Sequence, residues 1–251
     1  MRHVFIILFA GVLFCRGEDA RLVTYLNTRY PLESPLVAWE TTAAVLQDDF
    51  QKLTGRGAVS GRDLRVGQFA PWLREQFARL PRECPVVIYL SSHQEKNGDW
   101  RFKDGRMPLA QIVRVLTDVI GSRPALVIND SCHAGAWERI AWPENMRLVL
   151  VSGRDELNES LHMRNDSPAM EKLYRRKIGQ FRDQKRDLRI SYFGLLWLGP
   201  DDAQANPAVS FSLNPAQWSK LRRMLHDRSN LLQREVRRVK LPKLLFKSLP
   251  E

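Results

Sequence analysis

Two residues with reactive side chains follow buried-type apolar runs of this sequence. The run "VVIYLSS" (residues 86–92) precedes His93, and the run "LVINDS" (residues 126–131) precedes Cys132. A thiol attacks as the thiolate, and a nearby imidazole lowers its pKa or accepts its proton. A cysteine or a histidine alone at a strand end is more often structural. Together, on successive strands, the two residues predict a Cys–His pair for nucleophilic catalysis.

Both runs are apolar on two sides, which is typical of central strands in a parallel sheet. Open α/β sheets carry their sites beyond the carboxyl ends of the strands, and neighbouring strands lie about 4.8 Å apart. We therefore expect His93 and Cys132 to approach one another. The backbone N–H groups of Cys132 and of Gln94 would face the oxyanion of a tetrahedral intermediate. Ala134 and Gly135 are small enough to let the chain turn after the thiol.

The rest of the chain alternates between strand-like and helix-like segments, as α/β sandwiches with mostly parallel sheets do. Apolar residues recur at helical spacing in three segments, at about 43–53, 69–80 and 109–120. Further strands are expected at 21–26 and 146–153, with a candidate short strand at Leu64 to Val66, and residues 94–105 have the composition of a hairpin.

The N-terminus has the form of a secretory signal peptide. Arg2 precedes an apolar run at residues 4–15, and a small residue follows at the expected cleavage point. The run is too short to span a membrane, which takes about 20 residues. We therefore expect residues 1–17 to be removed and the mature protein to be exported, either secreted or periplasmic. The bulky Phe14 argues against lipid attachment at Cys15.

Removal of this signal leaves two cysteines, Cys84 and Cys132. Cys84 precedes the strand expected at 86–90, whereas Cys132 follows the strand expected at 126–128. If these strands are parallel neighbours, the thiols lie at opposite ends of the sheet, roughly 15–25 Å apart at about 3.3 Å per residue. A disulfide requires Cα atoms within about 7 Å of each other. We predict no disulfide, which in an exported protein points to a thiol with a function.

The chain is basic, with a formal net charge of +11 over 251 residues. This charge favours acidic partners, but no nucleic-acid-binding motif accompanies it, and we expect no specific nucleic-acid partner. The basic C-terminal tail has Lys and Arg between Leu and Val residues. Such a segment either contacts a membrane or packs on the sheet with a solvated basic face. Membrane contact is thus expected only through the N-terminal signal or this tail.

Residues 162–189 separate two parts of the chain that are richer in large apolar residues. The segment is dense in charges of both signs, a composition typical of an exposed helix or a linker. The length of the chain suits one sizeable domain. We expect the catalytic core at 18–161 and a C-terminal part of the same domain at 190–251.

The segment "DSCHAG" (residues 130–135) resembles the Asp-Ser-Cys-His-Ser-Gly nucleophile motif of metacaspases and bacterial caspase-like peptidases, which share the legumain and gingipain fold. The segment "VIYLSSHQ" (residues 87–94) is similar to that family's strand ending in Tyr-Ser-Gly-His-Gly, and "VSGRDELNES" (residues 151–160) to its next Ser-Gly stretch. The resemblance implies a caspase-like three-layer α/β/α sandwich with a mostly parallel central sheet. It also implies a cysteine endopeptidase that acts on proteins or peptides, with large- and small-subunit-like parts on either side of 162–189.

The resemblance further assigns roles to single residues. Cys132 would attack the scissile carbonyl and His93 would transfer protons. Asp130 and Ser91 match residues that line a pocket for an Arg or Lys before the cut, and a carboxylate facing a cation is a sound physical basis for that preference. The segment 162–189 corresponds to the intersubunit linker, and its basic residues offer sites for self-processing. No cofactor or metal site is implied; calcium activation, which some metacaspases need, stays open.

The chain also departs from the family pattern. Ser92 and Gln94 stand where the family has glycines on either side of the catalytic histidine, and Thr41 and Thr42 stand where it has an early Asn-Asp pair. These departures support an alternative, a caspase-like binding or regulatory module without catalysis. The presence of both His93 and the cysteine favours the peptidase.

Overall fold

A computed structural model describes residues 20–30, 37–153, 161–162, 189–198, 219, 223, 226–227 and 245–247. The expected signal peptide at 1–17 lies outside these ranges, as do nearly all of the charged segment 162–189 and most of the basic tail. The expectations for these three segments therefore stay predictions.

The central sheet has six strands, in the spatial order β10-β7-β6-β3-β1-β2. Five of them run parallel, and β10 pairs antiparallel with β7 at one edge. The bounds are β1 (Arg21–Leu26), β2 (Val59–Arg62), β3 (Val86–Ser91), β6 (Ala125–Asn129), β7 (Met146–Leu150) and β10 (Leu245–Lys247). The expected mostly parallel sheet is confirmed, with β3 and β6 at its centre.

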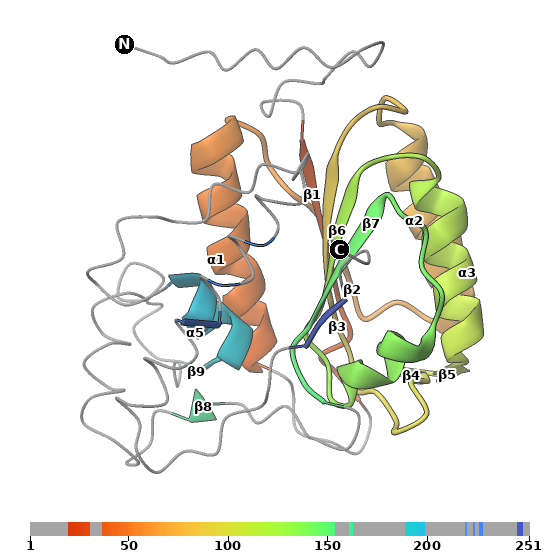
Figure 1. Cartoon of the computed structure of the whole chain (residues 1–251). Coiled ribbons are helices and arrows are strands. Elements are labelled where there is room, and N and C mark those ends of the chain that lie inside the picture. Colours follow the sequence, from red (N-terminus) through yellow and green to blue (C-terminus); the bar gives the residue numbers. More distant parts are fainter. Residues whose placement is uncertain are drawn as a thin grey trace, which may run out of the picture.

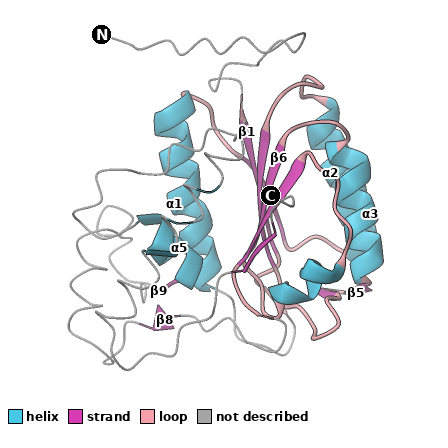
Figure 2. Ribbon diagram, in the orientation of Figure 1, coloured by secondary structure: helices cyan, strands magenta, loops and turns pink. Residues whose placement is uncertain are grey.

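Helices cover both faces of this sheet (Figures 1 and 2). On one face lie α1 (Val37–Thr54) and α5 (Tyr192–Leu198), and on the other lie α2 (Val66–Ala78) and α3 (Leu109–Ile120). The three apolar stripes read from the sequence fall on α1, α2 and α3, because each stripe is the side of its helix that packs on the sheet. The three-layer α/β/α sandwich is thus confirmed.

Successive side chains of each strand enter opposite layers of the sandwich. In β3, Ile88 and Leu90 belong to the apolar core beneath α2 and α3. The residues between and after them, Tyr89 and Ser91, are also buried but point to the layer of α1 and α5. The same alternation along β6 sends Asn129 toward the α2/α3 layer. The next residue, Asp130, enters the α1/α5 layer.

The prediction of a short strand at Leu64–Val66 is wrong. The edge strand β2 ends at Arg62, and Val66 already begins α2. β2 has the sequence "VSGR", which carries almost no apolar alternation, so its pairing with β1 is what defines it as a strand. Its Gly61 packs directly under the indole of Trp72, where a Cβ atom would come within 2.5 Å of the ring.

Shorter elements complete the described chain. The expected hairpin is confirmed as β4 (Trp100–Phe102) and β5 (Gly105–Met107), and a 3₁₀ helix, η2 (Ala134–Arg139), begins two residues after Cys132. β8 (Leu161–His162) pairs with β9 (Arg189–Ile190), one strand at each end of the charged segment. Among the described residues, none of the helices has the length and apolar character needed to cross a bilayer.

Candidate active site

The central strands β3 and β6 bring His93 and Cys132 to the same level, just beyond the carboxyl ends of the two strands. These strands pair in parallel with Leu90 opposite Asn129. His93 lies three residues beyond Leu90, and Cys132 lies three residues beyond Asn129. Both residues are partly exposed. The candidate dyad therefore sits where open α/β sheets carry their sites, beyond the carboxyl ends of adjacent central strands.

Beyond the last paired residues of β3 and β6, two hydrogen bonds keep the two chain segments in the same register. The Ser92 amide donates to Ser131 Oγ at 3.1 Å, and Gln94 Nε2 donates to the His133 carbonyl at 3.0 Å. Each bond joins residues 39 positions apart, which is also the separation of the catalytic candidates. The backbones at 93 and 132 are thus held side by side by a bond before them and a bond after them.

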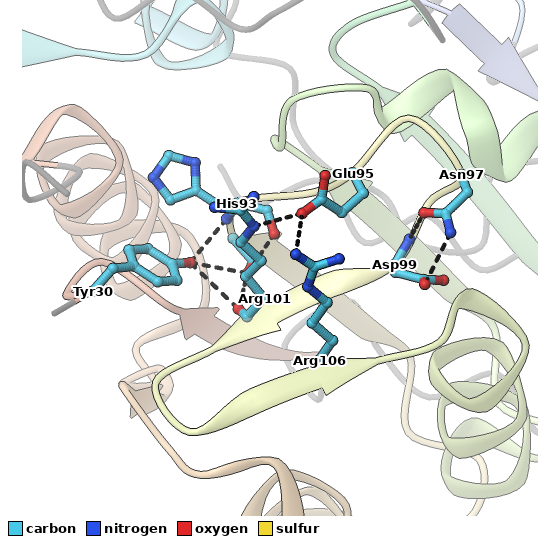
Figure 3. A network of polar contacts seen from close by, with 8 residues as sticks. Tyr30, His93, Glu95, Asn97, Asp99, Arg101 and Arg106 are labelled. Atoms are coloured by element: carbon cyan, nitrogen blue, oxygen red, sulfur yellow. Dashed lines mark hydrogen bonds and ion pairs between the residues drawn. The ribbon is translucent and has the colours of Figure 1, made fainter. Parts of the chain in front are cut away.

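The backbone of His93 is fixed by Tyr30, which follows β1. The His93 amide donates to the Tyr30 hydroxyl at 2.9 Å, and that hydroxyl donates to the Asn27 carbonyl at 2.9 Å. The two rings also pack together, with centroids 4.5 Å apart and planes inclined by 58°. On the other side, the Arg101 amide donates to the His93 carbonyl at 2.9 Å. Figure 3 shows the imidazole extending away from the hairpin, beside the phenol ring.

Ion pairs and side-chain bonds order the hairpin that follows His93 (Figure 3). The Glu95 carboxylate accepts a hydrogen bond from Arg101 Nε at 2.5 Å and lies 3.5 Å from Arg106. The Asp99 carboxylate accepts the Leu109 amide at 3.0 Å, which ties the hairpin to the first turn of α3. The loop carrying His93 is therefore anchored at both of its ends.

The turn at residues 132–135, called the nucleophile turn after the candidate nucleophile Cys132, is held in an unusual backbone conformation. His133, directly after Cys132, has φ 55° and ψ 26°, in the left-handed region that residues other than glycine seldom adopt. Ser152 secures the next two residues: its Oγ accepts the Ala134 amide at 3.1 Å and its carbonyl accepts the Gly135 amide at 2.8 Å. The cysteine therefore precedes a sharp turn that buried bonds maintain.

The hydrogen bonds of the hairpin indicate to which side the backbone amide of Gln94 points. Gln94 and Trp100 form an antiparallel bridge whose bonds come from the flanking residues, Arg101 to His93 and Glu95 to Asp99. In that type of pair the N–H of the central residue points away from its partner strand. It points to the same side as the amide two residues earlier, which donates to the loop of Cys132. This is the orientation expected of an oxyanion-binding amide.

Asp130 lies fully buried in the layer of α1 and α5. Its carboxylate accepts hydrogen bonds from the Tyr89 hydroxyl at 2.7 Å and from Ser191 Oγ at 2.5 Å. Burial raises the pKa of Asp130 to about 6, and the bonds from Ser191 and Tyr89 oppose that rise without cancelling it. The same burial, together with the neighbouring carboxylate, raises the pKa of Tyr89 well above its usual range.

Ser91 and Thr42 lie in the same layer as Asp130. Ser91 is buried, and within the described residues its hydroxyl has no hydrogen-bond partner. Thr42, which stands where the resembling family has an acid, hydrogen-bonds Ser191 Oγ at 2.9 Å and so joins the Asp130 network. The two predicted pocket residues, Ser91 and Asp130, thus lie on the same face of the sheet, and both are buried.

A solved structure has the same arrangement of elements. The crystal structure of caspase-1 from Spodoptera frugiperda matches with a TM-score of 0.51 and 9% sequence identity, over 78% of this chain and 82% of that chain. This chain has the caspase-like fold. No protein-family model and no curated protein sequence matches it. The caspase-like fold expected from the sequence is confirmed, while the chemistry has to be argued from this chain's own residues.

Several residues of this candidate site were not identified from the sequence. Tyr30, Tyr89, Ser152 and Ser191 hold the dyad or the buried carboxylate, yet they lie on four different elements or loops. Tyr89 has a local signal, because period-two alternation along β3 puts it on the same face as Ser91. Ser152 lies in the Ser-Gly stretch at 151–160 that is similar to the metacaspase pattern, although no role was assigned to it from the sequence. Tyr30 and Ser191 have no local signal, since only the strand order brings them to the site.

The two cysteines behave as the sequence predicts. Cys84 is buried before β3, Cys132 follows β6, and neither forms a disulfide. In the described part of the chain, no three His, Cys, Asp or Glu side chains are grouped so that they could hold a metal ion.

Proposed function

We propose that the chain is an exported cysteine endopeptidase that uses a Cys132–His93 dyad and cleaves after Arg or Lys. The observation that carries the proposal is the shared level of the two side chains beyond β3 and β6, continued by the bonds from Ser92 and Gln94. A structural cysteine and a structural histidine have no need of matched positions at the functional edge of a parallel sheet.

In the first half of the reaction, Cys132 Sγ, deprotonated with the help of His93, attacks the scissile carbonyl carbon. The tetrahedral oxyanion accepts hydrogen bonds from the backbone amides of Gln94 and Cys132. The C–N bond then breaks, His93 donates the proton to the departing amine, and a thioester with Sγ remains.

In the second half, water attacks the thioester carbonyl while His93 accepts a proton from that water. The second tetrahedral oxyanion uses the same two amides. Its collapse breaks the C–S bond, releases the carboxylic acid and returns Cys132 to the thiol or thiolate.

The preference for basic residues rests on Asp130. This carboxylate is buried, and the bonds described for it come from neutral hydroxyls, so ionisation carries a desolvation cost that the raised pKa reflects. A guanidinium or ammonium group from substrate would offset that cost and favour the ionised form. The Ser91 hydroxyl, on the same face, would contact the same substrate group.

Three further parts of the proposal concern segments or ligands beyond the described residues. The proposed export rests on the signal-like residues 1–17, and cleavage after Gly17 is favoured over lipid attachment at Cys15, because Phe14 is bulky. Self-processing would occur at basic residues within 162–189, and an active preparation that stays one intact band without inhibitor would contradict it. Calcium acts, if at all, as an activator rather than as a catalytic metal.

The test compares the mature protein with two cysteine variants, Cys132→Ala and the matched control Cys84→Ala. Each is given reporter peptides ending in Arg, Lys, Asn or Asp, under reducing conditions, with and without calcium. We expect cleavage after Arg and Lys that falls by at least about 10³-fold in Cys132→Ala, since the nucleophile is gone. Cys84 lies at the opposite end of β3, so its variant should keep the activity.

Other outcomes separate the parts of the proposal. Cleavage only after Asn or Asp would keep the dyad and overturn the role given to Asp130. The non-catalytic module would be favoured if the folded protein cleaves no peptide and Cys132 does not react with thiol-directed probes.

A further inference from the structure

The side chain of Gln94 spans the gap between the two strand ends of the site. Its Oε1 accepts hydrogen bonds from Asn129 Nδ2 and from Trp100 Nε1, both at 3.0 Å. Its Nε2 donates to the His133 carbonyl, also at 3.0 Å. The glutamine is 5% exposed, so water does not compete with these three bonds. One amide thus joins the hairpin, the end of β6 and the nucleophile turn.

The orientation of this amide is fixed by chemistry. The indole nitrogen of Trp100 can only donate a hydrogen bond, so the atom of Gln94 that faces it must be the oxygen. The amide nitrogen of Gln94 is then the atom that faces the His133 carbonyl, which can only accept. Exchanging the two atoms would place donor against donor and acceptor against acceptor.

The bond to His133 falls on the most constrained residue of the turn. The left-handed backbone of His133 is disfavoured for a side chain with a Cβ atom, so neighbouring contacts must maintain it. Gln94 holds the carbonyl of His133, and Ser152 holds the amides of Ala134 and Gly135. The Ala136 amide also donates to the His133 carbonyl at 3.0 Å, and Ser152 Oγ donates to the Ser131 carbonyl at 2.9 Å. Loss of the Gln94 bond therefore leaves these bonds in place and removes the described hydrogen bond that joins His133 to the hairpin after His93.

We propose that Gln94 is a positioning residue of the active site, whose side-chain amide fixes the turn at His133 and so sets where Cys132 lies against His93. This inference rests on the proposed peptidase function. The glutamine replaces a glycine of the resembling family, so its side chain marks a way of holding the nucleophile turn that is this chain's own. The side chain acts on the α2/α3 side of the sheet, while the backbone amide of the same residue faces the oxyanion.

The first test replaces Gln94 by Met, which keeps the length of the side chain and removes its polar atoms. We expect kcat to fall on the order of 10²-fold with little change in KM, because misplacing a reacting group by about 1 Å has that effect. The pH dependence of Cys132 alkylation by iodoacetamide gives a second readout. It should show the thiol pKa moving up toward its ordinary value of about 8.5, since pairing with His93 is weakened.

The matched control is Gln47→Met. Gln47 also uses its Nε2 in hydrogen bonds, to Thr24 and Ser60, but at the far edge of the sheet. This variant should leave kcat and the alkylation profile unchanged even if it unfolds more easily. A Gln94→Met protein that is folded and matches the wild type in both readouts overturns the inference.

Gln94→Glu provides a test that keeps the shape of the side chain. Only the protonated acid can donate to the His133 carbonyl, and burial raises the pKa of such a carboxyl. The ratio of variant to wild-type kcat/KM should therefore fall as the pH rises, and titration of Asp130 cancels in this ratio. A ratio that does not change with pH contradicts the inference.

The alkylation readout keeps the two hypotheses apart. If the wild type cleaves no peptide, the peptidase proposal fails. A shift of the Cys132 thiol pKa in Gln94→Met would still support the positioning role of Gln94. If the wild type cleaves as proposed and the Gln94 variants behave like it, only the positioning role of Gln94 fails.

Discussion

The layer between the sheet and helices α2 and α3 holds an aromatic and aliphatic core, with rings from Tyr25, Phe69 and Trp100 in contact. The layer on the other face, beneath α1 and α5, buries the carboxylate of Asp130 among hydroxyl groups, including that of Tyr89. Both layers are closed to water at these residues. They differ in whether the polar groups inside them can ionise.

Under the proposed function, this difference would give the two faces different roles at the site. On the α2/α3 face, the polar groups next to the dyad are amides and an indole, which stay neutral at every working pH. They are suited to hold the nucleophile turn at fixed geometry. On the α1/α5 face, burial raises the pKa of Asp130 to about 6, and it is this carboxylate that we propose binds the cation of the substrate. Position would come from one face and specificity from the other.

The largest expected effect is the loss in free energy of unfolding when a cavity is made in each layer. Phe69 packs against the rings of Tyr25, Trp100 and Phe102, and Phe69→Ala should lower the free energy of unfolding by about 3–5 kcal/mol. Phe193→Ala, on the short helix α5, should cost less, because that helix can settle into the space. Chemical denaturation of both variants measures the difference. Equal losses would show that the two layers are equally rigid.

A smaller effect is expected from Asp130→Asn as the pH changes. In the wild type the pKa of Asp130 rises from 3.8 to about 6 on folding, so the folded state holds the proton more tightly. The contribution of Asp130 to the free energy of unfolding is therefore highest below about pH 4 and falls as the pH rises to about 6, by about 3 kcal/mol. The free energy of unfolding of the wild type minus that of the variant should follow this fall.

Activity should follow the opposite trend in the same pH window. Ionised Asp130 attracts a basic side chain, so KM for an Arg peptide should decrease as the pH rises through about 6. A wild-type KM that is flat between pH 5 and 7, or one that changes equally in Asp130→Asn, would remove the carboxylate from the specificity pocket.

The smallest effect is expected from Tyr30→Phe. The variant keeps the ring against His93 and removes the hydroxyl that accepts the His93 amide. We expect kcat to fall about tenfold and stability to fall by about 1–2 kcal/mol, because the hydroxyl accepts the His93 amide and donates to the Asn27 carbonyl, and one hydrogen bond usually contributes about 1 kcal/mol net. Kinetics with an Arg peptide and urea denaturation measure the two changes. An unchanged kcat would mean that strand pairing alone places the imidazole.

The elements that were predicted correctly carry strong local patterns. β3 and β6 are continuous apolar runs, and α3 has apolar residues along one side, so burial can be read from a few consecutive residues. The edge strand β2 was misplaced because "VSGR" has no such pattern. His93 and Cys132 could be predicted as a candidate pair because each closely follows one of the clear strands.

The sequence alone determined the fold class, the two central strands and the reactive residues at their ends, because local periodicity encodes which side chains are buried. Only the tertiary structure decided which distant residues support them. Tyr30 reaches His93 across 63 positions, and Ser191 joins Thr42 across 149. Such pairings depend on strand order, register and helix placement, which arise from the packing of the whole chain rather than from any short segment of it.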